Sequence, residues 1–379
     1  MNIPTTASST PLSAMTAGES EAWAKDEGLP AYRGRQLFAA LSKRAIQSVA
    51  EITEFPAALR SRLEADRAVR SVRVLSHLRS GADGSEKVLF GLTDGAAVET
   101  VLIPSSRRAG RQRFTVCVSS QVGCPAGCTF CATGLGGFGR NLGGYEIVDQ
   151  VQYFAHALRQ SGQHVTNVVF MGMGEPFLNV PGVRDAVERL TDAAGFGLGN
   201  RHITVSTVGI VPQIRRFAEW GGQVNLAISL HAPNDDLRSR LVPYNEHFPI
   251  ADILSVTREY VERTHRRVSF EYVLLKGTND SRPLARELAG LLLPLGGAAH
   301  VNLIPWNPFR EGQFRRSEGP DAESFRRELL AAGLNATIRY SKGLDISAAC
   351  GQLRESHETA TASGLSNAVV IRQLSPTPQ

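Results

Sequence analysis

The chain has 379 residues, a formal net charge of +5 and a pI near 9.1, which allows one large domain plus a small one with a full apolar core. Its five cysteines and the absence of a basic start followed by an apolar run argue against a secreted, disulfide-stabilised fold and predict a reducing, cytoplasmic setting. No stretch approaches about 18 uninterrupted apolar residues, so no membrane span is expected.

The first 70 residues divide into a tail and a helical domain. Residues 1–20 are rich in Ser, Thr and Ala without periodic apolar positions, which predicts a flexible N-terminal tail. From Ala31 onward Leu37, Phe38 and Leu41 recur at helical spacing, so residues 21–70 are predicted to form a small helical domain. Basic residues outnumber acidic ones there, which favours an anionic partner.

A β-hairpin is predicted next, because two strand-like runs, Lys87–Leu92 and Ala97–Ile103, flank Thr93-Asp94-Gly95. We assign residues 71–109 to this linker region. A basic run without acids follows, and its position beside a cysteine-rich loop suggests that it faces a polyanionic substrate. The run contains Arg107, Arg108, Arg111 and Arg113.

Strand-like and helical segments then alternate. The predicted strands are Phe114–Val118, Val165–Met171, His202–Val208, Val224–Leu230, Val268–Leu274 and His300–Ile304. The predicted helices lie near 145–159, 181–194, 210–219, 250–264, 282–293 and 321–333. Six βα units predict the α/β class with a parallel sheet. No glycine-rich dinucleotide fingerprint follows the first strand, so we expect a partial (β/α)6 barrel, similar to a TIM barrel, over residues 110–343.

Polar residues and glycines recur after the predicted strands, where such a barrel places its chemistry. They are Gly172-Met173-Gly174-Glu175-Pro176, Ser206-Thr207, Ser229-Leu230-His231 and Pro305-Trp306-Asn307. Each alone is compatible with an ordinary loop. Four such groups at the same mouth favour a small-molecule pocket.

The cysteine spacing is the most specific signal in the chain. Cys124, Cys128 and Cys131 form a C-x3-C-x2-C run that can hold three irons of a 4Fe–4S cluster and leave the fourth iron open. The alternative is three inert core thiols. Two further cysteines, Cys117 and Cys350, stand outside the run. Residues 344–354 form the segment around Cys350, and residues 355–379 are predicted to be a flexible C-terminal tail.

These motifs carry a resemblance. The C-x3-C-x2-C run, with Phe130 before its last cysteine, is similar to the cluster signature of radical S-adenosylmethionine (SAM) enzymes. From about Leu29 to Leu353 the chain resembles the RlmN/Cfr family of adenosine-C-methylating RNA methyltransferases, and most closely its RlmN branch. The sequence motifs that support this narrower resemblance are residues 117–124, 171–176, 229–231, 304–307 and 349–353.

The resemblance implies a role for each matching residue. Cys124, Cys128 and Cys131 would bind the cluster. SAM would bind to Gly174, Glu175, Ser206, Ser229, Leu230, His231 and Asn307. Cys350 would carry a methyl group from one SAM, a second SAM would yield the 5′-deoxyadenosyl radical that activates it, and Cys117 would resolve the protein–RNA adduct, leaving a Cys117–Cys350 disulfide. Glu99 would accept the proton. Residues 21–70 would be an RNA-binding accessory domain.

The resemblance further implies adenine C2 methylation of 23S rRNA and of tRNA beside the anticodon, electron supply by a flavodoxin or ferredoxin, and a monomeric enzyme without membrane contact. Three alternatives remain open from the residues. They are methylation of adenine C8 in 23S rRNA, a radical SAM reaction on a small molecule, and a non-enzymatic iron–sulfur RNA-binding regulator.

Overall fold

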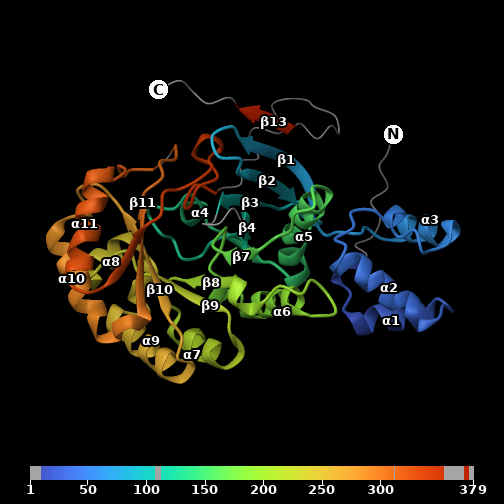
Figure 1. Ribbon diagram of the computed structural model, residues 1–379, viewed down its shortest axis with the longest axis horizontal. Helices are drawn as coiled ribbons and strands as arrows, with labels where there is room; N and C mark the ends of the chain where they lie inside the picture. Colours follow the sequence, from blue (N-terminus) through green and yellow to red (C-terminus); the bar gives the residue numbers. More distant parts are fainter. Residues whose placement is uncertain (1–9, 107–111, 311, 354–370, 375–379) are drawn as a thin grey trace.

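An eleven-stranded sheet forms the centre of the computed structural model, which describes residues 10–106, 112–310, 312–353 and 371–374 (Figure 1). Its strand order is β12-β11-β10-β9-β8-β7-β4-β3-β2-β1-β13. From β4 to β12 all neighbouring strands are parallel and follow one another in chain order. This is the order of a barrel wound one βα unit at a time, as the sequence predicted.

The parallel strands are β4 (Gln112–Cys117), β7 (Asn167–Phe170), β8 (Ile203–Thr207), β9 (Asn225–Ser229), β10 (Val268–Leu274), β11 (Ala299–Pro305) and β12 (Asn335–Ile338). The helices that connect them are α5 (Gly144–Gln160), α6 (Val180–Thr191), α7 (Val211–Trp220), α8 (Asp235–Leu241), α9 (Ile250–Thr264), α10 (Arg282–Leu292) and α11 (Gly319–Ala331). All six predicted strands and all six predicted helices are confirmed. The sequence analysis missed β12 and α8.

Three strands extend the sheet with antiparallel pairing, and a fourth closes that edge. They are β3 (Ala97–Ser106), β2 (Glu86–Gly91), β1 (Arg73–Ser80) and, parallel to β1, β13 (Ile371–Leu374). The predicted hairpin is therefore confirmed as β2 and β3. The tail predicted for 355–379 is wrong for residues 371–374, because the exposed edge of β1 offers backbone partners that local composition does not reveal.

The N-terminal helices α1 (Ala17–Asp26), α2 (Ala31–Ser42) and α3 (Ala57–Asp66) enclose an apolar cluster of their own, centred on Trp23, Leu37 and Leu41. The tail predicted for residues 1–20 is wrong from Leu12 onward. Leu12 is fully buried in that cluster, and Thr16 and Glu19 cap α1 by exchanging hydrogen bonds of 2.7 and 3.2 Å with each other's backbone amides.

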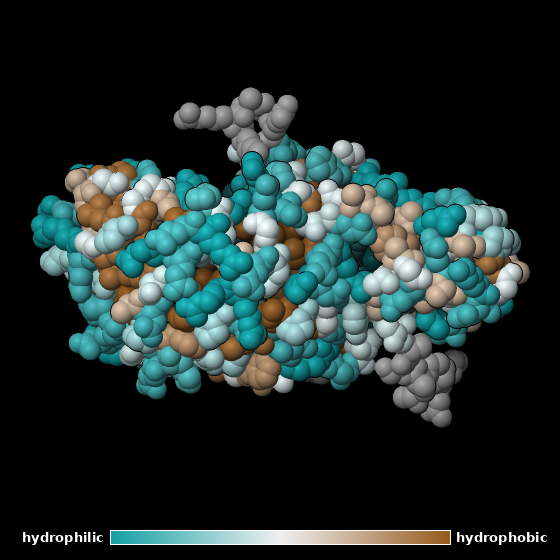
Figure 2. Space-filling model, turned by 90° about the horizontal axis from the view of Figure 1, so that it is seen from below, coloured by the Kyte–Doolittle hydropathy of each residue, from teal (hydrophilic) through white to brown (hydrophobic). Residues whose placement is uncertain are grey.

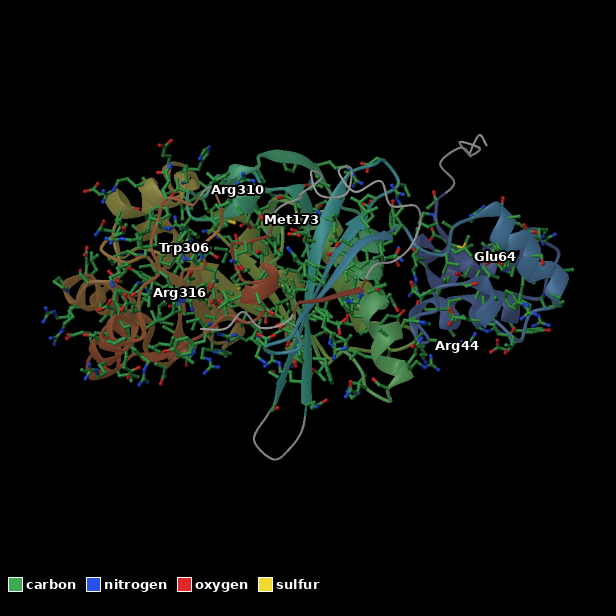
Figure 3. The ribbon with its side chains drawn as sticks, turned by 90° about the horizontal axis from the view of Figure 1, so that it is seen from above. Arg44, Glu64, Met173, Trp306, Arg310 and Arg316 are labelled. Carbon is green, nitrogen blue, oxygen red and sulfur yellow. The ribbon has the colours of Figure 1, made fainter. Side chains whose placement is uncertain are left out.

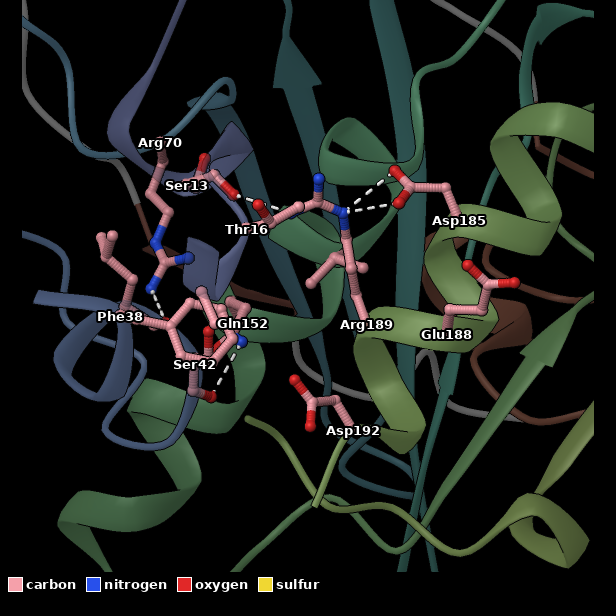
Figure 4. A pocket seen from close by; sticks show the side chains of 13 residues that line it. Ser13, Thr16, Phe38, Ser42, Arg70, Gln152, Asp185, Glu188, Arg189 and Asp192 are labelled. Carbon is pink, nitrogen blue, oxygen red and sulfur yellow. Dashed lines mark hydrogen bonds and ion pairs between the residues drawn. The ribbon is translucent and has the colours of Figure 1, made fainter. Parts of the chain in front are cut away.

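A buried ion pair joins these helices to the barrel. The Arg70 guanidinium lies 3.0 Å from the Asp149 carboxylate on α5, and neither side chain has appreciable solvent contact. Ser13 and Ser71 donate to the same carboxylate at 2.7 Å. Beside this anchor lies a cavity of about 290 Å³, lined by side chains of both parts of the chain (Figure 4). Removing one partner of a buried ion pair leaves the other charge unpaired and lowers stability by more than the pair itself contributes. This contact therefore fixes the position of the N-terminal helices on the barrel.

Polar side chains cover most of the face shown in Figure 2, with apolar residues in scattered patches. Among the described residues, no helix combines the length and the apolar character that crossing a bilayer requires.

Candidate active site

The three cysteines of the C-x3-C-x2-C run lie between β5 (Gln121–Gly123) and α4 (Ala132–Leu135). The loop begins at Gly123, which has a φ of +69°, and a β-carbon there would lie 2.1 Å from the Gly137 carbonyl oxygen. The Cys124 amide donates to the same oxygen at 2.7 Å. β6 (Phe138–Asn141) pairs with β5 and keeps the start of the loop next to Gly137. A glycine at position 123 is therefore required for the loop to close.

The three cysteines of the run lie close enough for their charges to affect one another. Burial raises the pKa of Cys124 to about 12, and the neighbouring Glu175 and Cys131 add to the rise. Burial also raises the pKa of Cys128, with Cys131 and Cys124 as the next causes. The Cys124 and Cys128 thiols are therefore protonated without metal, and binding irons must release these protons.

This donor set fits an iron–sulfur cluster. Within the described ranges no three His, Cys, Asp or Glu side chains surround the position of one ion, which is compatible with a cluster because each thiolate binds a separate iron. The loop packs against apolar residues such as Ala126 and Trp306, and the Trp306 indole donates to the Phe130 carbonyl at 2.9 Å. Three thiolates would leave one iron open to a small molecule.

Gly174 and Glu175 follow β7 at the carboxyl ends of the strands. Gly174 has a φ of +107°, and a β-carbon would lie 2.7 Å from the Ser120 hydroxyl, so only glycine fits. The buried Glu175 carboxylate accepts from the Phe177 and Val208 amides at 2.9 and 2.8 Å. Burial nevertheless raises its pKa to about 7.

Three predicted SAM contacts continue along the next strands. The Ser206 and Ser229 hydroxyls lie 3.3 Å apart at the ends of β8 and β9. Leu230 is buried, and its amide donates to the Glu271 carbonyl at 3.0 Å, which fixes the backbone just after β9. Together these residues place hydroxyl groups on one side of the mouth.

His231 is a neutral hydrogen-bond donor at this mouth. Its Nδ1 accepts from the Val273 amide at 3.1 Å, which leaves the proton on Nε2. Burial lowers the pKa of His231 to about 3, so the ring is uncharged at neutral pH. The ring meets the edge of Phe130 at a centroid distance of 4.7 Å, directly beside the cysteine loop.

The two lone cysteines influence each other electrostatically although they lie 233 positions apart in the sequence. Cys117 ends β4 and is buried, which raises its pKa, and the charge of a Cys350 thiolate would raise it further. Cys350 faces open space, but desolvation by the surrounding protein raises its pKa, with Glu271 as the next cause and Cys131 also contributing. Cys350 therefore lies within electrostatic reach of both Cys117 and the cysteine loop.

Hydrogen bonds fix the segment around Cys350 on the cysteine loop. The Ala132 amide donates to the Gly351 carbonyl at 2.8 Å, and the Thr133 hydroxyl donates to the Leu353 carbonyl at 2.5 Å. Asn307, which the sequence analysis predicts to bind SAM, donates from its amide group to the Cys350 carbonyl at 3.0 Å. Its oxygen accepts from Arg316 at 2.8 Å. Asn307 thus positions Cys350 in this structure. Figure 3 marks Trp306 and Arg316 in this part of the core.

Glu99 lies on β3 and is almost fully buried. Its carboxylate pairs with Lys87 at 2.8 Å, and the Lys87 ammonium also donates to the Ser347 carbonyl at 3.2 Å. Lys87 therefore connects Glu99 to the segment that carries Cys350. The sequence analysis did not single out Lys87, since a lysine in a hairpin strand is normally exposed.

Sequence reasoning also missed Arg238 on α8, one of the largest fully buried side chains. Its guanidinium donates to the carbonyls of Leu230 at 3.1 Å, Ser229 at 3.2 Å and Val208, and to the Asn245 amide oxygen at 2.6 Å. Burial lowers the pKa of Arg238 to about 10. It holds together the carboxyl ends of β8 and β9, where the predicted SAM contacts lie. A basic residue on a short polar helix gives no sequence signal of burial.

Replacing Arg238 with Met is expected to lower the free energy of unfolding by roughly 3–5 kcal/mol, because several buried carbonyls lose their donor. Urea unfolding followed by circular dichroism measures this. Arg240→Met, on the same helix but exposed, is the matched control and is expected to change stability by less than about 0.5 kcal/mol. Equal effects of the two substitutions would contradict the assigned role.

Comparison with known proteins gives a consistent result. Residues 118–288 match the model of the radical SAM superfamily. A protein from Gloeobacter violaceus named "Probable dual-specificity RNA methyltransferase RlmN" is 48% identical over 345 residues, which cover 91% of this chain and 95% of that protein. "Ribosomal RNA large subunit methyltransferase N" from Nitrosopumilus maritimus is 46% identical over 332 residues, 87% of this chain and 94% of the other.

A solved structure is also similar. The crystal structure of a radical SAM methyltransferase from Sphaerobacter thermophilus superposes with a TM-score of 0.85 and 45% sequence identity, covering 91% of this chain and 99% of that one.

Proposed function

The chain belongs to the RlmN family of radical SAM RNA methyltransferases, and from this premise we propose that it methylates adenine C2 in 23S rRNA and in tRNA beside the anticodon. As a family member it is an RNA methyltransferase that uses a 4Fe–4S cluster and SAM. The observation that supports the finer proposal is the attachment of the Cys350 segment to the cysteine loop by the hydrogen bonds of Ala132 and Thr133, with Cys117 close enough to be affected by the charge of Cys350. A route through a methylated cysteine suits an acceptor carbon that is not nucleophilic, as adenine C2 is.

In the proposed mechanism, separate sets of residues bind the cluster and SAM. Cys124, Cys128 and Cys131 would hold the cluster, which when bound supplies the electron that cleaves SAM. Gly174 and Glu175 would bind the amino end of SAM, and the lack of a side chain at Gly174 lets its backbone pack against Ser120 and Gln121. Hydroxyls at the ends of β8 and β9, together with Leu230 and His231, would bind the rest of the molecule.

Cys350 would take the methyl group, losing its thiol proton and releasing S-adenosylhomocysteine. After the activated methyl carbon has bonded to the base and the ring has given up one electron and one proton, a Cys117 thiolate would attack the Cys350 sulfur. The disulfide bond forms as the sulfur–carbon bond breaks, and the released carbon takes up a proton to give the methylated adenine. Glu99 would accept the proton displaced from the ring, with Lys87 stabilising its carboxylate. The disulfide must then be reduced before the next turnover.

We also propose that the enzyme acts as a cytoplasmic monomer and that a flavodoxin or ferredoxin supplies its electrons. An acidic redox protein suits a chain of net positive charge.

Nucleoside mass spectrometry of 23S rRNA and tRNA treated with the reconstituted enzyme tests the product. We expect 2-methyladenosine in both RNAs, and none without SAM. Finding only 8-methyladenosine would assign the chain to the C8 reaction. Finding methylation of rRNA alone would remove tRNA from the proposed substrates.

A further inference from the structure

A second hollow lies away from the mouth, at the amino ends of β4, β7 and β8. It is a groove of about 740 Å³ between the N-terminal helices and the barrel. Its charged and imidazole side chains are Lys43, Arg44, Arg113, Arg159, His164 and His202, and no Asp or Glu lines it within the described part of the chain. Figure 3 shows Arg44 on the side of the N-terminal helices that faces the core.

The positive charge of the groove comes from both parts of the molecule. Lys43 and Arg44 follow α2, whereas Arg159 lies in the last turn of α5. The Arg159 guanidinium donates to the Arg44 carbonyl at 3.1 Å. Arg44 also pairs with Glu54 at 2.9 Å, outside the groove lining. Gln112 and Gln163 add amide groups to the lining, and the Gln163 Nε2 donates to the Gln112 Oε1 at 2.9 Å. Cationic and amide side chains are the groups that contact phosphates in protein–nucleic acid complexes, and a lining that contains no acidic side chain suits such an anion.

The groove is separate from the catalytic mouth. β4 begins at Gln112 beside the groove and ends at Cys117, a length of about 17 Å at the usual rise per residue. A nucleotide in the groove therefore cannot be the one that meets Cys350. A redox protein docked there would be separated from the cysteine loop by the length of the strands, which disfavours an electron donor as the occupant.

We propose that this groove binds the phosphate backbone of the substrate RNA at a point remote from the modified adenine. The proposal rests on the proposed function, since it takes tRNA as a substrate. The groove would select folded RNA that is large enough to reach from the mouth to the other end of the barrel. The three arginines of the run at 107–111 adjoin it in sequence but lie outside the described residues.

The double variant Lys43→Gln/Arg159→Gln tests the proposal in the holoenzyme. Filter binding is measured from 50 to 300 mM salt with a complete tRNA transcript and with a hairpin of its anticodon stem and loop alone. We expect the variant to bind the complete tRNA roughly tenfold more weakly, with the slope of log affinity against log salt reduced by about 1.8, because two phosphate contacts are lost. Binding of the hairpin should remain unchanged.

Arg258→Gln/Arg327→Gln removes two exposed charges from α9 and α11 and is the matched control, expected to bind both RNAs like the parent enzyme. Equal losses on tRNA and hairpin, or an unchanged salt slope, would overturn the proposal. So would normal RNA binding with impaired reduction by flavodoxin, which would assign the groove to the electron donor. Failure of the proposed function is distinguishable, since it would appear as absent methylation of both RNAs by the parent enzyme.

Discussion

Replacing Cys350 with Ala is expected to lower RNA methylation by roughly three orders of magnitude or more, because no other group can carry the methyl. Cys350 lies within electrostatic reach of Cys117 and Cys131, and Asn307 and Ala132 hold its segment through backbone carbonyls. An alanine keeps those backbone contacts, so the fold and the iron content should not change. Mass spectrometry of the protein after incubation with SAM should show no added methyl group.

Replacing Cys117 with Ala should have a different outcome. Methylation of Cys350 should proceed, but nothing then resolves the covalent adduct, so RNA should remain attached to the protein in denaturing gels. The two variants are each other's controls because both remove one sulfur from the same site. Equal amounts of RNA-linked protein from both variants would contradict the separate roles.

Replacing Cys131 with Ala is expected to remove most of the bound iron, from about four irons per chain after anaerobic reconstitution. A cluster held by three thiolates has no spare ligand, and the buried Cys124 and Cys128 thiols cannot move to take its place. Iron analysis and visible absorption measure the loss. Cys350→Ala is the matched control and should keep its iron. Unchanged iron in Cys131→Ala would refute the assignment of the cluster to this run.

Much of the barrel was predictable from periodicity. β10 has the bounds predicted for it, Val268–Leu274, because a buried parallel strand appears as a continuous apolar run. The helix α1 was predictable in principle from Thr16 and Glu19, which have the spacing of a capping box, but the Ser- and Thr-rich composition favoured a tail. β13 could not be predicted, because its pairing with β1 depends on an edge distant in sequence.

The candidate site was also predictable from the sequence only in part. The cysteine spacing predicts the cluster loop locally, since its three thiols belong to eight consecutive residues, Cys124–Cys131. The approach of Cys350 to Cys117 followed only from the family resemblance. The role of Asn307 toward the Cys350 carbonyl and the burial of Arg238 depend on tertiary contacts that no local pattern encodes.

The attachment of the Cys350 segment to α4 has a consequence for biosynthesis. Ala132 and Thr133 follow the last cluster cysteine, and their partners Gly351 and Leu353 leave the ribosome more than two hundred residues later. The nascent barrel can therefore complete its strands and fold its metal loop before the methyl acceptor exists. Correct placement of Cys350 then depends on a loop that is synthesised long before it, so the methyl acceptor takes up its position only where that loop has folded.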